Sequence, residues 1–183
     1  MGYTKHLTMK KIIYQNKWLD LYELDNKISP GEKFYGVKPP DYVTTVALDS
    51  EQMVFMVSQY RPVIGEFSLE TPGGQIDEGQ SPEEAINQEL IEELGHSFGR
   101  IERVAVLHPD VGRLMNKLYI FKASLPSPES IAPETGIEVR RYSSKSLARL
   151  IASGELKSAY SIAALSLVLG PDLFPQDNLH SVP

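Results

Sequence analysis

The chain has 183 residues, no cysteine and a formal net charge of −6. The lack of cysteine excludes a disulfide framework and thiol chemistry, and it favours a cytoplasmic location. The acidic balance argues against non-specific binding to nucleic acid, and no apolar stretch approaches the ~20 residues of a membrane span.

The first half of the chain is predicted to form strands. Alternating or β-branched segments occur at residues 18–28, 33–37, 42–48, 53–58 and 67–70. Pro30-Gly31 and Asp49-Ser50 mark turns between them. The last of these strands leads into Gly73-Gly74, where the backbone is free to approach a ligand closely.

A helix with clear start and stop signals follows this glycine loop. Ser81 is a good N-cap, Pro82 suits the first helical position, and Glu84 completes a capping box. The apolar stripe consists of Ile86, Leu90 and Leu94, and Gly95 is placed to be the C-cap. Ala85, Glu89, Glu92 and Glu93 are therefore expected on a flank beside the buried stripe.

The second half is predicted to contain strands at 101–107, 117–123 and 137–142, and helices at 144–152 and 158–169. Gly170-Pro171 ends the last helix. Mixed strands with helices before and after them predict an α/β/α sandwich of the α/β (α+β) class.

Three carboxylates, those of Glu89, Glu92 and Glu93, crowd one side of the first helix. Like charges three or four residues apart cost an isolated helix roughly 0.2–0.5 kcal/mol per pair. Either this is a solvated acidic face, or a divalent cation with hard oxygen ligands uses the cluster.

The run from Gly74 to His96 resembles the signature of the Nudix hydrolases, G-x5-E-x7-R-E-U-x-E-E-x-G-U, with U aliphatic. The matching positions are Gly74, Glu89, Leu90, Glu92, Glu93 and Gly95, and the departures are Gln80, Gln88 and His96. The resemblance implies a magnesium site, with manganese as an alternative ion. Its ligands would be the Gly73 carbonyl, Glu89 and Glu93, supported by Glu92. Glu92 and Glu93 would also be the catalytic residues.

Gln80 and Gln88 stand where the family has a glutamate and an arginine that form an ion pair. A single replacement would leave a partly buried charge unpaired, at a cost of several kcal/mol. Two glutamines carry no charge and still form an amide–amide hydrogen bond. We therefore interpret them as a neutral substitute for the ion pair.

The flanks resemble the ADP-ribose and nucleoside-diphosphate-sugar pyrophosphatase branch of the family. The similar stretches are Gln59–Pro62, Leu69–Gly74, Ile137–Val139 and Ser153–Leu156. Residues 1–40 resemble the N-terminal strands that build a homodimer in that branch, which leaves 41–183 as the Nudix domain.

Three side chains are expected to contact the substrate: Arg61, Glu70 and Arg113. The planar guanidinium of arginine suits a phosphate clamp. The alternative for Arg61 is a solvent-exposed side chain, or an ion pair with Glu66 or Glu70. A surface arginine is the alternative for Arg113.

The general base is left open, because relatives place a glutamate where this chain has Asn116. Asparagine cannot take a proton from water at neutral pH. The alternatives are Asp110, His108, Glu134, Glu138 or a glutamate of the first helix.

Taken together, the residues and the resemblance predict metal-assisted hydrolysis of a diphosphate linkage. The substrate would be ADP-ribose or another nucleoside diphosphate sugar, and the products a nucleoside monophosphate and a sugar phosphate. The competing interpretations are a Nudix-fold nucleotide-sugar sensor with weakened or no catalysis, a structural or interaction protein, and a Nudix enzyme that cleaves dinucleoside polyphosphates or capped ends.

Overall fold

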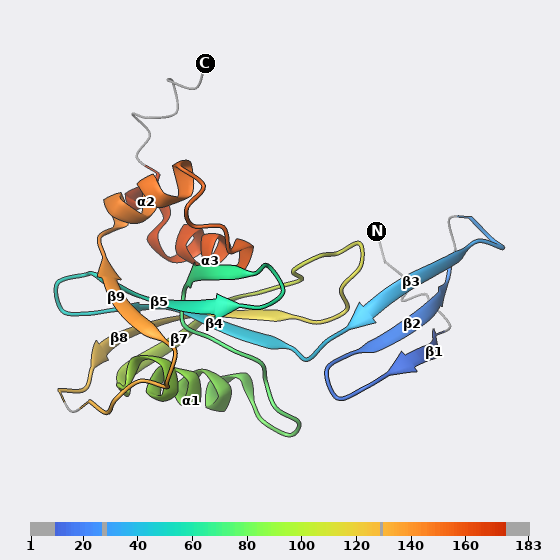
Figure 1. Ribbon diagram of the computed structural model, residues 1–183, viewed down its shortest axis with the longest axis horizontal. Coiled ribbons are helices and arrows are strands. Elements are labelled where there is room, and N and C mark those ends of the chain that lie inside the picture. Colours follow the sequence, from blue (N-terminus) through green and yellow to red (C-terminus); the bar gives the residue numbers. More distant parts are fainter. Residues whose placement is uncertain (1–9, 27–28, 129, 175–183) are drawn as a thin grey trace, which may run out of the picture. The chain divides into compact units, whose positions relative to one another are not determined.

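The computed structural model describes residues 10–26, 29–128 and 130–174 (Figure 1). Contacts between residues divide the chain into two compact units. The first combines the N-terminal part up to Asp41 with His108–Lys117. The second combines Tyr42–Leu107 with the chain from Leu118 onward.

The first unit is built on a three-stranded antiparallel sheet. Its strands are β1 (Lys10–Gln15), β2 (Asp20–Asp25) and β3 (Lys33–Lys38), in the order β1-β2-β3. The segment 108–117 joins this sheet through Val37, whose N–H donates to the Arg113 carbonyl at 2.9 Å. The sequence prediction missed β1. The strand predicted at 18–28 corresponds to β2 but also included Trp18, Leu19 and Asn26, which lie outside β2, and residues 27–28 lie outside the described residues.

The second unit contains a six-stranded mixed sheet. Its strands are β4 (Tyr42–Leu48), β5 (Val54–Arg61), β6 (Glu66–Glu70), β7 (Phe98–Leu107), β8 (Leu118–Pro126) and β9 (Glu138–Tyr142). The order is β6-β5-β4-β8-β7, and β9 pairs with β5. Only the β4–β8 pairing is parallel among the pairings of described strands, so the predicted mixed sheet is confirmed.

Helices cover both faces of this sheet (Figure 1). Side chains alternate along β4, so Val43 and Ala47 pack against α1 (Pro82–Leu94). Val46 and Leu48 face the opposite way, toward α2 (Ser144–Ala152) and α3 (Ala159–Leu169), which a short 3₁₀ turn at Gly170–Asp172 follows. The predicted α/β/α sandwich is confirmed.

No helix among residues 10–26, 29–128 and 130–174 is long and apolar enough to cross a membrane.

The predicted limits of α1 are confirmed by its caps. The Ser81 hydroxyl accepts from the Glu84 N–H, and the Glu84 carboxylate accepts from the Ser81 N–H at 2.8 Å. Gly95 closes the helix with φ +74°, a left-handed conformation that favours glycine. The predicted flank is wrong in part, because Ala85 and Glu93 are buried together with the apolar stripe.

Candidate active site

The glycine loop runs along β4 like an additional strand. The N–H of Val43 donates to the Gly74 carbonyl and that of Thr45 to the Pro72 carbonyl, both at 2.9 Å. Because backbone groups alternate in direction along a strand, the N–H and carbonyl groups of Gly73 point away from the backbone of β4. A Cβ on Gly73 would lie 2.1 Å from the Val43 carbonyl oxygen, so only glycine fits.

Glu93 is held beneath this loop by the burial of its helix face. Its carboxylate accepts from the Gly73 N–H at 2.9 Å and from Gln59 Nε2 at 3.3 Å. Burial raises the pKa of Glu93 to about 8, although the hydrogen bond from Gly73 opposes the rise. A neighbouring cation would therefore favour its charged form.

Glu89, one helical turn earlier, lies against the next residue of the loop. A Cβ on Gly74 would be 1.9 Å from Glu89 Oε1, so the lack of a side chain there makes room for this carboxylate. Burial raises the pKa of Glu89 to about 7, and the charges of Glu92, Glu134 and Asp77 raise it further. Negative charge therefore accumulates around Glu89.

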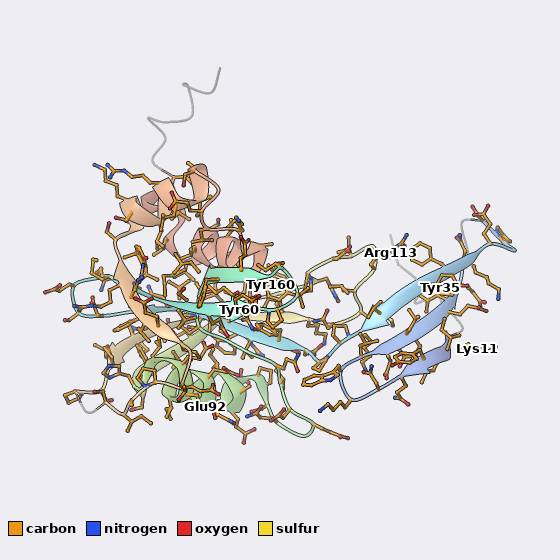
Figure 2. All side chains as sticks on the ribbon, in the orientation of Figure 1. Lys11, Tyr35, Tyr60, Glu92, Arg113 and Tyr160 are labelled. Atoms are coloured by element: carbon orange, nitrogen blue, oxygen red, sulfur yellow. The ribbon has the colours of Figure 1, made fainter. Side chains whose placement is uncertain are left out.

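Glu92 is exposed on α1 (Figure 2) and ends a chain of side-chain amides. Gln80 Nε2 donates to Gln88 Oε1 at 2.9 Å, and Gln88 Nε2 donates to Glu92 Oε1 at 2.8 Å. The hydrogen bond predicted between Gln80 and Gln88 is therefore present. Gln80 Oε1 also accepts from the Asp77 N–H at 3.2 Å, which ties the loop to the helix.

A polar pocket of about 190 Å³ opens beside these groups. It is lined by Gln75, Asp77, Gln80, Ala85, Gln88, Glu89 and Glu92. In the described part of the chain, no ion pair joins Glu89, Glu92 or Glu93 to a basic side chain. Unpaired, partly buried carboxylates are costly, and their oxygens suit a hard divalent cation.

The carboxylates are nevertheless not gathered around one point. Within the described ranges, no three acidic or histidine side chains are arranged to hold one ion together. Glu93 turns to Gly73 and Glu92 turns to Gln88. The donor set thus fits a divalent cation in chemical type, and its assignment as a metal site stays a prediction.

Arg61 and Glu70 are already paired with each other. Arg61 Nε donates to Glu70 Oε1 at 2.9 Å and a terminal nitrogen donates to Oε2 at 2.6 Å, a bidentate arrangement. Glu66 pairs instead with Lys157 at 2.8 Å. The ion pair considered as an alternative is therefore present, and substrate binding by Arg61 and Glu70 stays a prediction.

Arg113 belongs to the first unit, where its guanidinium lies 4.5 Å from the centre of the Phe34 ring. Asn116 is 2% exposed, and its Nδ2 donates to the Pro40 carbonyl at 3.0 Å. Asp110 Oδ1 accepts from the Gly112 N–H at 2.8 Å, which stabilises the turn there. These contacts satisfy Asp110 Oδ1 and the amide nitrogen of Asn116, whereas the buried Asn116 Oδ1 has no hydrogen-bond partner among the described residues. The role of Arg113 stays a prediction.

The remaining candidates for the base differ in their surroundings. Glu138 is exposed and paired with Arg140 at 2.8 Å. His108 Nδ1 lies 3.2 Å from the Asn116 carbonyl. The N–H of Glu134 donates to the Glu92 carbonyl at 2.8 Å, so the loop carrying Glu134 is attached to α1. Of these three, Glu134 is the one whose negative charge raises the pKa of Glu89.

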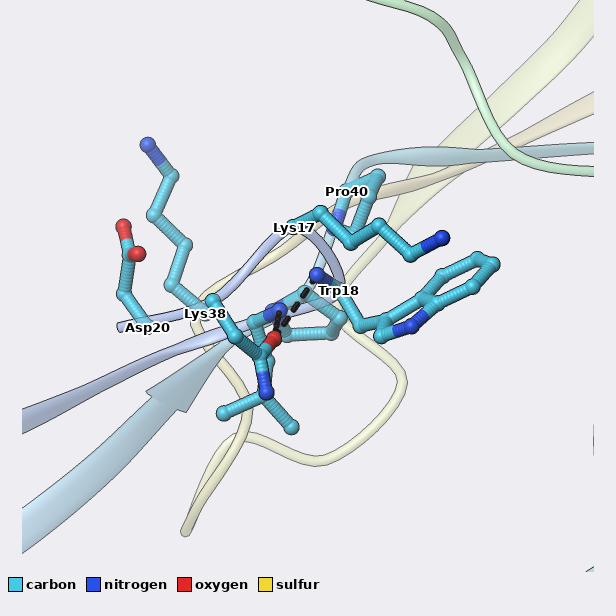
Figure 3. A pocket seen from close by; sticks show the side chains of 8 residues that line it. Lys17, Trp18, Asp20, Lys38 and Pro40 are labelled. Atoms are coloured by element: carbon cyan, nitrogen blue, oxygen red, sulfur yellow. Dashed lines mark hydrogen bonds between the residues drawn. The ribbon is translucent and has the colours of Figure 1, made fainter. Parts of the chain in front are cut away.

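A second pocket, of about 200 Å³, lies in the first unit (Figure 3). Its lining includes Trp18, Lys17 and Lys38, and the Lys17 ammonium is 4.6 Å from the centre of the indole. Asn16 Oδ1 fixes the turn by accepting from the N–H groups of Trp18 and Leu19 at 2.8 and 3.0 Å.

Two neighbours of the helix carboxylates were not foreseen from the sequence. Asp77 lines the pocket, and the Tyr42 hydroxyl donates to the Gly73 carbonyl at 3.1 Å. Asp77 lies in the sequence between the glycine loop and the helix cap, and this position was a weak indication that it lines the pocket. No local pattern distinguishes Tyr42 from an ordinary strand residue.

Comparisons with known proteins agree with this geometry. A family model described as the NUDIX domain matches residues 38–159. The chain is 27% identical over 167 residues to the ADP-ribose pyrophosphatase of Bacillus subtilis (strain 168), covering 86% of this chain and 90% of that protein. It is 47% identical over 45 residues to the ADP-sugar pyrophosphatase of Mus musculus, covering 25% and 21%.

A solved structure described as an ADP compounds hydrolase has the same fold, with a TM-score of 0.73 and 18% sequence identity. The match covers 92% of this chain and 95% of that one. The domain match spans well over half of the chain, around the loop and helix that carry the carboxylates. The chain therefore belongs to the Nudix hydrolase family.

Proposed function

We propose that the protein hydrolyses the diphosphate linkage of ADP-ribose or another nucleoside diphosphate sugar in a metal-dependent reaction. Water attacks one phosphorus, the bridging P–O bond breaks, and a nucleoside monophosphate and a sugar phosphate leave. The observation that carries the proposal is that two carboxylates, the partly buried Glu89 and the buried Glu93, lie against Gly73-Gly74 without an ion-pair partner among the described residues. The names of the relatives supply the substrate class.

Magnesium, or manganese, is the proposed cofactor. Its ligands are Glu89, Glu93 and the Gly73 carbonyl, and Glu92 supports them from the pocket. Once bound, such an ion supplies Lewis acidity toward the diphosphate oxygens. The chain itself holds Glu93 in place through Gly73 and Gln59.

Arg61, Glu70 and Arg113 are the proposed substrate contacts. The bidentate bond to Glu70 uses one edge of the Arg61 guanidinium, and Tyr42 also interacts with this group. The proposal assigns the outer N–H donors to a phosphate oxygen. Glu70 then acts by orienting Arg61.

Glu134 is the proposed general base. Its side chain is exposed, its loop is hydrogen-bonded to α1, and its negative charge raises the pKa of Glu89. Glu138 is bonded to Arg140, which makes it the weaker acceptor.

A panel of nucleoside diphosphate sugars, including ADP-ribose, tests the function in the presence of magnesium or manganese. Products are separated by chromatography, with EDTA as the metal-free arm. Glu93→Gln and Glu134→Gln are each expected to lower turnover by roughly 100-fold or more, whereas the control Glu138→Gln retains it. Full turnover by Glu93→Gln contradicts the metal assignment.

Two other outcomes select the competing functions. Binding of nucleotide sugars without turnover in either metal identifies a sensor. The lack of any metal-dependent stabilisation identifies a structural protein with an acidic helix.

The proposal includes a homodimer formed through residues 1–40, and a cytoplasmic location. The three-stranded sheet supports the first, because Ile13, Tyr14 and Tyr35 expose apolar surface there. Light scattering after size-exclusion chromatography tests it, and a monomer at micromolar concentration contradicts it.

A further inference from the structure

The Gly73 peptide is held on two sides, by Glu93 of the family signature and by Tyr42, which lies outside that signature. Its N–H donates to Glu93 and its carbonyl accepts from the Tyr42 hydroxyl at 3.1 Å. Burial raises the pKa of Tyr42, so that the phenol keeps the proton it donates. Both polar groups of this peptide are therefore hydrogen-bonded before any ligand arrives, and the carbonyl oxygen keeps a second lone pair.

Directly before Gly73, three buried hydroxyl groups from distant parts of the chain meet. Thr44 of β4 and Thr71 have their hydroxyl oxygens 2.7 Å apart. The Thr71 hydroxyl donates to Ser161 Oγ of α3 at 3.1 Å, and the Thr71 N–H donates to the same oxygen at 2.9 Å. All three residues are at most 4% exposed.

This chain of hydroxyls reaches a helix cap. Ser161 Oγ donates at 3.0 Å to Ser158 Oγ, the N-cap of α3. At its other end, the single proton of the Thr44 hydroxyl has two acceptors within reach, the Thr71 hydroxyl oxygen at 2.7 Å and the Pro72 carbonyl at 3.2 Å. β4 and α3 thus converge on the two residues before Gly73.

We infer that Thr44, Thr71, Ser161 and Tyr42 are positioning residues for the hydrolytic site. They lock the segment 71–73 between β4 and α3, and thereby fix where the Gly73 N–H holds Glu93 and where the Gly73 carbonyl points. Through that carbonyl and Glu93 they act on the cation-binding groups, so this inference rests on the proposed function.

If these hydroxyl groups only filled the core, they would not need to form hydrogen bonds to residues 71–73. The neighbouring Thr45 shows the difference, because it is fully buried and its hydroxyl has no hydrogen-bond partner among the residues that the structure describes. Thr44 and Thr45 point to opposite faces of β4. Thr45→Val is therefore a matched control that removes a buried hydroxyl outside the network.

The test compares Thr71→Val, Thr71→Ser and Thr45→Val in the full chain. Hydrogen exchange of the Gly73 amide is followed by NMR, and Mn²⁺ affinity is followed by titration. Loss of one net hydrogen bond predicts about 2- to 10-fold faster Gly73 exchange and similarly weaker Mn²⁺ binding for Thr71→Val. Thr71→Ser keeps wild-type values, and Thr45→Val changes neither measurement.

Tyr42→Phe removes only the hydroxyl at the Gly73 carbonyl, and decides the question if Thr71→Val fails to fold. Weaker Mn²⁺ binding by Tyr42→Phe with an unchanged melting temperature supports the inference. The inference is overturned if the network variants behave like Thr45→Val, or if exchange accelerates equally throughout β4 and β8.

The same experiment separates this inference from the proposed function. If the wild type shows no Mn²⁺ binding while Thr71→Val still loosens Gly73 selectively, the metal-dependent function fails and the positioning network stands. If the wild type binds Mn²⁺ and neither Thr71→Val nor Tyr42→Phe weakens binding, the network fails alone.

Discussion

Gln80 donates its side-chain amide to Gln88 Oε1 at 2.9 Å, across the junction between the loop and α1. Gln88 in turn donates to Glu92, so a neutral side-chain pair orients one of the helix carboxylates. Gln88 is exposed, and charge at this position is therefore less costly than the sequence alone implied.

The glutamine pair predicts coupled effects of charged replacements. Gln80→Glu adds a negative charge beside Asp77. Gln88→Arg supplies a guanidinium that competes with the proposed metal ion for Glu92. Each single change is expected to lower metal-dependent kcat/KM, and the double variant to recover it. The coupling free energy from urea unfolding is expected at about 0.5–1 kcal/mol.

The outcome that contradicts this pairing is specific. Gln88→Arg alone would have to raise both stability and activity while the double variant did not.

Adding one methyl group at each of the two adjacent glycines is expected to have different consequences, a loss of stability at Gly73 and a loss of activity at Gly74. In Gly73→Ala the methyl meets the Val43 backbone, so the protein is expected to lose about 1–3 kcal/mol of unfolding free energy. In Gly74→Ala it meets the flexible end of Glu89, which moves aside. Gly74→Ala should therefore unfold near the wild-type temperature yet lose activity about tenfold or more.

Gly99→Ala is the control for this pair, because its Cβ would make ordinary contacts of 3.6 Å with Leu125. Equal thermal stability of Gly73→Ala and Gly74→Ala contradicts the assignment of the two contacts.

The raised pKa values of Glu89, to about 7, and Glu93, to about 8, predict a pH-dependent stability of the metal-free protein. A carboxyl with a folded pKa above its unfolded value contributes stability that is complete below the unfolded pKa and is lost as pH rises through the folded pKa. In EDTA, the melting temperature should fall between about pH 5 and about pH 8.

Added magnesium should reverse this loss at the upper end, where the carboxylates are charged. Glu93→Gln, which cannot ionise, should show a flatter profile in EDTA. A melting temperature that rises over the same interval has the wrong sign for these pKa shifts.

The bidentate pair of Arg61 with Glu70 predicts a distinct kinetic effect for Arg61→Lys. Lysine keeps the charge and loses the planar fork of donors. KM for the nucleotide sugar is expected to rise about tenfold with little change in kcat. Arg140→Lys, in the exposed pair with Glu138, should leave both constants unchanged. A lower melting temperature with an unchanged KM would leave Arg61 a purely structural role.

The sequence predicted the sandwich and the limits of α1 because those depend on local signals. Ser81, Glu84 and Gly95 determine the helix ends through their own backbone neighbours. The strand β1 was missed because Lys10–Gln15 alternates weakly and gains its place only by pairing with β2.

The site was predictable to the extent that its residues are close in sequence. Glu89, Glu92 and Glu93 share one helix, and the burial of Glu93 was missed because it depends on a loop that folds back on that helix. Tyr42 and Ser161 reach the loop from 31 and 90 residues away along the chain. Such contacts are set by the β4 register and by α3 packing, which no local pattern records.

Glu92 and Glu93 are neighbours in sequence, yet one is in water and the other is enclosed by protein. Dissolved ions screen a charge in water far more than an enclosed one. Salt should therefore weaken the attraction of Glu92 for an approaching cation and leave that of Glu93 almost intact. One turn of α1 thus combines a carboxylate whose attraction for cations depends on ionic strength, Glu92, with one whose attraction depends on it little, Glu93.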